Sequence, residues 1–160
     1  MPADAPWTTA LDLPVLRVEL RPGDPLPSVS VPWFDVRVHA RSAPFAGTVE
    51  SAWFTEDLRA LRAALTGIVA VAEEESRWRP GDVLPGDDES PVFTVGGNRA
   101  AELRLSGGLA SSGDAVWLTA WVTPNGDDPY PALHLHTFED RAALTAHLGD
   151  LDALLEAAAR

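Results

Sequence analysis

The 160-residue sequence contains no cysteine, no lysine and no long apolar run. Without cysteine there is no thiol nucleophile, and the fold must be held by its own core, which a chain of this length can build. A membrane-spanning helix needs about 20 consecutive apolar residues, and no stretch approaches that length. We draw no functional conclusion from the absence of lysine, because the abundance of Ala, Leu, Arg, Pro and Gly resembles a GC-rich coding bias.

Positive charge is also scarce. The chain has 12 basic residues, all arginine, against 24 acidic residues, and its formal net charge is −12. This balance argues against a nucleic-acid partner, because phosphates are attracted by a positive field. The acidic surplus favours a basic partner through long-range attraction, and it equally serves solubility. The stretch from Met1 to Ala10 lacks the basic region and apolar core of a secretory signal, and we therefore expect a cytoplasmic protein.

The composition predicts one globular domain over residues 1–160. Hydrophobic residues make up 46% and charged residues 22%, as in ordinary globular proteins. Residues 1–14 carry three prolines and little periodicity, which predicts an N-terminal arm. Residues 80–91 are rich in Gly, Pro and acids, which predicts a long acidic loop.

Alternation of apolar and polar residues predicts six or seven strands. In the first, Leu16, Val18 and Leu20 alternate with charged residues. The short links between successive strands favour antiparallel pairing, because parallel strands need longer crossovers. The predicted strands cover residues 16–21, 34–41, 48–54, 92–95, 99–105, 115–123 and 132–137.

Two segments change from a period of two to a helical period. Apolar residues recur three and four apart after Glu56-Asp57, and again at the same offsets after Glu139-Asp140, where Thr137 and Asp140 have the spacing of a capping box. Two amphipathic helices produce equal offsets by physics alone, and an internal duplication would also explain them. The sequence thus predicts an α+β fold with one mostly antiparallel sheet of six or seven strands and two principal helices, in the order βββ-α-βββ(β)-α. The helices are predicted near residues 55–75 and 138–158, and the predicted core comprises Val36, Val38, Leu61, Leu65, Ile68, Leu103, Leu118, Leu133, Leu135, Leu144, Leu148 and Leu151.

Aromatic and imidazole side chains form the main candidate site. Trp117 and Trp121 lie on one face of a predicted strand, opposite an aliphatic row. His134 and His136 lie on one face of the predicted neighbouring strand, so the two rows should share a surface. Exposed paired tryptophans would indicate an interface, whereas an arm, loop or helix covering them is the simpler structural alternative.

Other candidate sites are weaker. Two histidines supply fewer ligands than zinc requires, so we expect no tightly held metal and no cofactor. Asp87, Asp88 and Glu89 lack the ligand spacing of an EF-hand loop and are predicted to be a solvated loop that offers a second, acidic surface to a partner. No Gly-x-Ser-x-Gly elbow or phosphate-binding loop is present, and we expect no catalytic centre.

A family resemblance rests on a few turns and the hydrophobic pattern. With Phe45-Ala-Gly47 before the third predicted strand and Phe54-Thr-Glu-Asp-Leu58 at the helix start, the chain resembles small bacterial proteins of the WapI-type immunity group and allied uncharacterised actinobacterial families. A later pattern like Val116-Trp-Leu118 precedes the last hairpin and helix in both. The resemblance implies a protein that neutralises a cognate toxin by binding it.

Two classes of function remain open from the sequence. The first is a non-enzymatic protein-binding module, most specifically an immunity-like protein whose partner is basic. The second is a small enzyme or metal-binding protein that uses the strand face of His134 and His136.

Overall fold

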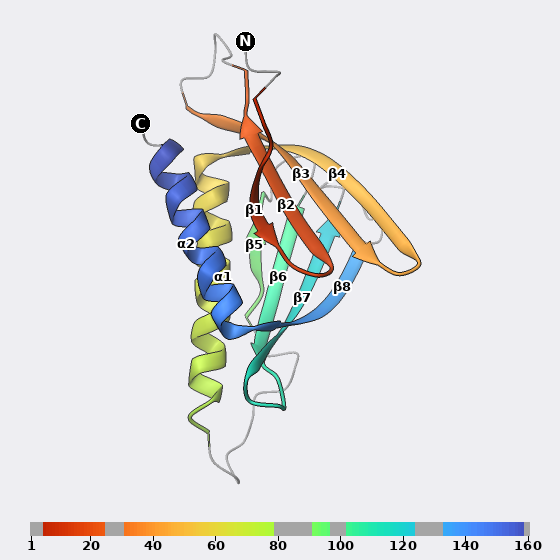
Figure 1. The fold of residues 1–160 in the computed structure, drawn as a ribbon, viewed down its shortest axis with the longest axis vertical. Helices are drawn as coiled ribbons and strands as arrows, with labels where there is room; N and C mark the ends of the chain where they lie inside the picture. The colour runs from red at the N-terminus through yellow and green to blue at the C-terminus, as the bar shows by residue number, and fades with distance from the viewer. Residues whose placement is uncertain (1–4, 25–30, 79–90, 97–101, 124–132, 159–160) are drawn as a thin grey trace.

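The computed structural model describes residues 5–24, 31–78, 91–96, 102–123 and 133–158, which form eight strands and two helices. Four strands and a helix follow one another twice along the chain (Figure 1). The elements are β1 Thr8–Asp12, β2 Leu16–Pro22, β3 Trp33–Ser42, β4 Phe45–Phe54, α1 Thr55–Glu75, β5 Phe93–Val95, β6 Glu102–Leu109, β7 Ala115–Thr123, β8 Leu133–Asp140 and α2 Arg141–Ala158.

The strands form two separate sheets. One sheet has the order β1-β2-β3-β4 and the other has the order β5-β6-β7-β8, with every neighbouring pair antiparallel. The α+β class stands, but the prediction of one sheet with six or seven strands in the order βββ-α-βββ(β)-α is wrong. The physical reason is the position of α1. This helix packs on β5 and β6, so the second group of four strands does not continue the first sheet beside β4 and forms a sheet of its own.

The eighth strand, β1, lies within the segment predicted as an arm. It pairs with β2, and the register shifts between Thr9 and Leu11, as in a β-bulge. Ala10 and Leu11 are therefore both buried although they are adjacent in the sequence. The bulge breaks the alternation by which a strand is recognised, and this explains why the sequence pattern missed it.

Gly107 and Gly108, which follow the predicted strand over residues 99–105, belong to strand β6. A Cβ atom on Gly107 would lie 2.6 Å from the backbone oxygen of Trp117 and 2.7 Å from the side chain of Ile68. Gly107 thus permits a close approach of α1 and β7 to β6. Because both glycines lie where an added Cβ atom would meet neighbouring atoms, they are accommodated inside the strand, and β6 continues to Leu109, beyond the predicted end at residue 105.

Helix α1 has the predicted bounds, and helix α2 begins later than predicted. The carboxylate of Asp57 accepts a hydrogen bond from the backbone N–H of Phe54 at 2.8 Å, which stabilises the start of α1. The capping box predicted from Thr137 and Asp140 is wrong, because Thr137 is a buried residue of β8. Asp140 instead precedes the helix and accepts hydrogen bonds from the N–H groups of Ala142 at 2.6 Å and Ala143 at 3.4 Å.

The two halves share one core. Helix α1 packs chiefly on the second sheet, and α2 packs on α1 and on β1 of the first sheet, so each helix mainly covers strands of the other half. Both helices lie along one side of the molecule in Figure 1. All the predicted core residues are buried except Leu148, which is half-buried, and Leu133, which is 37% exposed at the start of β8.

Candidate functional site

The candidate site lies on the outer face of the second sheet. On β7, Val116, Leu118, Ala120 and Val122 are buried, so Trp117, Thr119 and Trp121 point away from the core. On β8, the alternation continues past the predicted strand end, and His134, His136 and Phe138 are exposed on that same outer face. The antiparallel register places Trp121 opposite His134, Thr119 opposite His136 and Trp117 opposite Phe138. The prediction that the tryptophan and histidine rows share a surface is confirmed.

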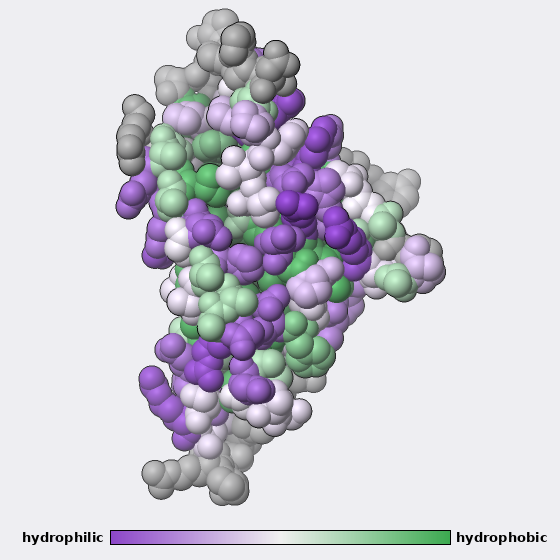
Figure 2. Space-filling model, in the orientation of Figure 1, coloured by the Kyte–Doolittle hydropathy of each residue, from purple (hydrophilic) through white to green (hydrophobic). Residues whose placement is uncertain are grey.

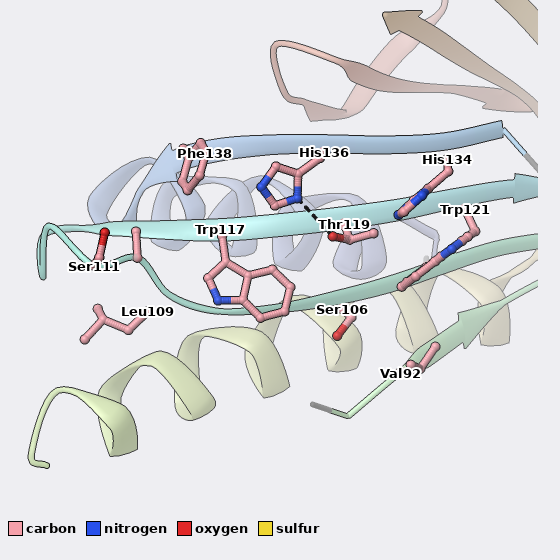
Figure 3. A pocket seen from close by; sticks show the side chains of 11 residues that line it. Val92, Ser106, Leu109, Ser111, Trp117, Thr119, Trp121, His134, His136 and Phe138 are labelled. Atoms are coloured by element: carbon pink, nitrogen blue, oxygen red, sulfur yellow. Dashed lines mark hydrogen bonds between the residues drawn. The ribbon is translucent and has the colours of Figure 1, made fainter. Parts of the chain in front are cut away.

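The rings of these two rows contact one another directly. Trp121 and His134 are stacked with ring centroids 5.2 Å apart and planes 5° apart. Trp117 and His136 are stacked at 6.3 Å, and His136 meets Phe138 edge to face at 5.1 Å. Figure 3 shows the rings on the two strands in two groups, with Phe138, His136 and Trp117 on one side of Thr119 and with His134 and Trp121 on the other. Such cross-strand ring pairs stiffen the surface before any ligand arrives.

A hydrogen bond orients the central histidine. The Nδ1 atom of His136 lies 3.1 Å from the hydroxyl oxygen of Thr119, and Figure 3 marks this bond. Thr119 is 8% exposed and lies between the two tryptophans on β7. The imidazole of His136 is therefore held in one orientation, while its Nε2 atom makes no hydrogen bond with any described residue.

A groove lies beside the aromatic row, because the residues of β6 next to it have small side chains or none. Ser106 and Gly108 lie on the outer face beside β7, and a Cβ atom on Gly108 would lie 2.9 Å from the indole nitrogen of Trp117. The groove encloses about 720 Å³, within the range of ligand and peptide sites. Its described lining comprises Val92, Ser106, Leu109, Ala110, Ser111, Trp117, Thr119, Trp121, His134, His136 and Phe138.

Neither indole is packed beneath a helix. Helix α1 contacts the opposite face of this sheet, where Ile68 approaches Gly107. Trp117 and Trp121 are half-buried, and Phe138 is 58% exposed. The described helices therefore leave the aromatic row uncovered, and the alternative of a covering loop concerns segments that lie outside the described residues.

The groove carries no fixed charge on its described lining residues. One carboxylate lies at its end, where Glu75 accepts a hydrogen bond from the backbone N–H of Leu109 at 2.5 Å. Strand β5 is three residues long and pairs with β6 only as far as Leu105, so Glu75 satisfies a donor on the unpaired part of the β6 edge. Asp87, Asp88 and Glu89 lie outside the described residues.

Among the described residues, no cluster of three or more His, Cys, Asp or Glu side chains is placed to hold a metal ion. His134 and His136 contribute two imidazoles to one face, and each contacts an indole rather than a carboxylate. Sequence reasoning missed Phe138, Ser106 and Val92. Phe138 could have been found by continuing the alternation of His134 and His136 for one more step.

The outer face of the first sheet is different in kind. Figure 2 shows hydrophilic side chains gathered over β1–β4 in this view. Trp7 lies beneath two guanidinium groups, with Arg37 at 4.1 Å and Arg21 at 4.8 Å from its ring centroid. Charged side chains pair across the strands as Arg21–Asp35 at 2.8 Å and Arg37–Glu50 at 2.9 Å, and Nε2 of His39 lies 2.8 Å from a carboxylate oxygen of Glu19. On this face, arginine side chains pair with carboxylates of neighbouring strands. The described lining of the aromatic groove, in contrast, contains no Asp, Glu or Arg.

Comparison with known proteins adds no family to these observations. No protein-family model matches the chain, and no curated protein matches it. Within the part of the chain that the structure describes, neither helix is long and apolar enough to cross a membrane.

Proposed function

We propose that this protein is a non-enzymatic binding module that holds a protein partner in the aromatic groove of its second sheet. The observation that carries the proposal is the row of five rings, Trp117, Trp121, His134, His136 and Phe138, on an outer face that no described helix covers. Indole and phenyl rings supply large contact areas at a small entropic cost, and they are the most common anchors of protein interfaces.

The partner is a basic protein. A net charge of −12 raises the rate of encounter with a positively charged surface, although charge by itself contributes little lasting affinity. The uncharged groove supplies the second element, because apolar rings lose little on desolvation when a partner covers them. Long-range attraction and short-range anchoring thus reside on different parts of the same molecule.

The resemblance to the WapI-type immunity group supports a narrower form of the proposal. In that form the basic partner is a toxin that this protein neutralises by binding. A gene for a large polymorphic toxin directly beside the gene for this chain would identify the partner to test.

The direct experiment measures binding of that toxin domain by surface plasmon resonance. Wild-type protein is compared with Trp121→Ala and with Trp7→Ala, a matched loss of an indole from the outer face of the other sheet. An interface anchor contributes about 2 kcal/mol or more, so Trp121→Ala should weaken binding roughly thirtyfold and Trp7→Ala should not. Equal affinity of Trp121→Ala and the wild type would overturn the groove as the contact surface.

A second candidate function is metal binding by His134 and His136, alone or in a small enzyme. It is favoured by the hydrogen bond between Nδ1 of His136 and the hydroxyl of Thr119, because an Nδ1–H group that donates to this oxygen leaves the lone pair of Nε2 free for a metal. The test is metal analysis of the purified protein before and after both histidines are replaced by alanine. Stoichiometric zinc that disappears in the double variant would favour this function over partner binding.

A further inference from the structure

The outer strand of the first sheet, β4, has a long unpaired edge. It is ten residues long and is hydrogen-bonded to β3 on one side only. On the other side, residues 46–53 make no backbone hydrogen bond with any described residue. An unpaired row of N–H and C=O groups of this length is a template for another strand.

The remaining sheet edges are shorter or covered. Strand β1 is covered by α2, and β5 has three residues and packs against α1. Strand β8 contacts α2 and β3, and it ends in the two acids Glu139 and Asp140. Strand β4 has none of the usual protections of an edge, because it contains no proline and no bulge, and Glu50 is its single charged residue.

Access to this edge is open near the hairpin, whereas Trp53 at the far end of β4 is buried on the inner face. The hairpin of β3 and β4 projects away from the helices in Figure 1. Ala46, Gly47 and Thr48 are all exposed, although successive residues of a strand face opposite sides of the sheet. Figure 2 shows little deep purple on this projecting end. A second strand can therefore approach without displacing a described element.

We infer that β4 pairs antiparallel with β4 of a second copy of this chain. The two first sheets then form one continuous eight-stranded sheet about a two-fold axis at Val49. In this register Val49 lies opposite Val49, and every residue from 45 to 53 has an opposite neighbour. The inference is independent of the proposed partner binding, because the aromatic groove lies on the other sheet.

Charge selects this register. Thr48 and Glu50 lie on the outer face, beside His39 and Arg37 of β3 respectively. A two-fold axis at Val49 places Thr48 opposite Glu50 of the second copy, twice in the dimer. Moving the axis by one residue toward Glu50 would place two carboxylates directly opposite each other, which is unfavourable. Moving it toward Thr48 would leave more of the strand unpaired.

At the two-fold axis, the inner face of the same register is apolar. Val49 is half-buried in the single chain and packs at the margin of its core. Two valines directly opposite each other cover that remaining surface, and β-branched pairs are favourable across strands. The dimer thus satisfies backbone groups, covers an apolar side chain and avoids like charges at the same time.

The test compares Thr48→Glu with Thr48→Lys by analytical ultracentrifugation over a wide concentration range. Both variants lose the hydrogen bond between Thr48 and Nδ1 of His39, so they form a matched pair. Thr48→Glu opposes Glu50 of the second copy and should weaken the dimer, whereas Thr48→Lys pairs with it and should strengthen the dimer. With two such contacts in each dimer, the dissociation constants of the two variants should differ roughly tenfold.

A rescue variant and a variant-free measurement complete the test. Thr48→Glu combined with Glu50→Thr exchanges the two residues and should restore wild-type affinity. In the wild type, hydrogen exchange of the backbone amides between residues 46 and 52 should slow as protein concentration rises, whether or not the variants fold. A wild-type protein that stays monomeric to millimolar concentration overturns the inference. A dimer whose affinity is equal in Thr48→Glu and Thr48→Lys also overturns it.

Discussion

At the residue scale, Trp53 on β4 and Trp121 on β7 are the same type of residue on opposite kinds of strand face, one facing the core and one facing outward. Trp53 is 0% exposed and lies in the core, whereas Trp121 is half-buried on the outer face of the second sheet. Trp53→Ala should lower the free energy of unfolding by about 3 to 5 kcal/mol, because it leaves a large cavity. Trp121→Ala should cost clearly less, because water can fill the space it vacates. Chemical denaturation measures both, and equal costs would show that Trp121 belongs to the core.

The same argument applies to the leucines of the two helices. Leu65 on α1 is 0% exposed, and Leu148 on α2 is partly buried at the margin of the core. Leu65→Ala should lower the free energy of unfolding by about 2 to 5 kcal/mol. Leu148→Ala should cost less than Leu65→Ala in the same denaturation experiment. The reverse order would contradict the assignment of α1 as the central helix of the core.

At the element scale, two glycines should respond in opposite directions to the same substitution. Gly107→Ala places a Cβ atom 2.6 Å from the backbone oxygen of Trp117, so strand β6 must shift away from β7 or α1. Gly149 lies in α2 with nothing within 4 Å of an added Cβ atom. Gly149→Ala should therefore raise the free energy of unfolding by about 0.5 to 1 kcal/mol, because alanine loses less backbone entropy in a helix.

Thermal unfolding measures both glycine variants. Gly107→Ala should lower Tm and Gly149→Ala should raise it. A fall in Tm for Gly149→Ala would mean that this face of α2 is packed rather than open.

An ion pair between Arg62 and Asp152 links the two helices. The Nε atom of Arg62 donates to Asp152 Oδ1, and its Nη2 atom donates to Oδ2 at 3.1 Å. The hydrogen bonds from Arg62 hold the pKa of Asp152 below its usual range, although partial burial opposes the shift. The same pairing raises the pKa of Arg62.

This ion pair predicts a pH-dependent contribution to stability. Because the pKa of Asp152 is lower in the folded chain, its contribution is complete above the unfolded pKa of about 3.9 and is lost as the pH falls through the lower folded value. Asp152→Asn should lower Tm at neutral pH. The difference in Tm between wild type and variant should shrink as the pH falls below about 4. A difference that is constant from neutral pH to pH 3 would contradict the assignment.

At the scale of the whole molecule, the net charge of −12 should govern the rate of partner association. Added salt should slow association of wild type and Trp121→Ala alike, because exposed charges are screened over about 8 Å at physiological ionic strength. Dissociation of the wild-type complex should respond little to salt, because it depends on the rings of the groove. Stopped-flow association rates at low and high salt measure the effect, and rates independent of salt would contradict a basic partner.

The sequence by itself determined the local elements and the facing of their side chains. The alternation on β7 placed Trp117 and Trp121 together, and the alternation on β8 placed His134 and His136 together. The helical period over Leu61, Leu65 and Ile68 predicted α1 with its observed bounds. These features follow from backbone geometry, which has a period of two in strands and of 3.6 in helices and needs no distant contact.

The tertiary structure alone decided how those elements are grouped. The sequence pattern could not divide the strands into two sheets, because the division depends on α1 packing against β5 and β6, which follow it in the chain. Strand β1 was hidden by its bulge, and Asp140 became the cap of α2 because β8 extends beyond the predicted strand end. The exposure of the aromatic row was likewise undetermined, since every sheet has two faces and only packing selects the one that a helix covers.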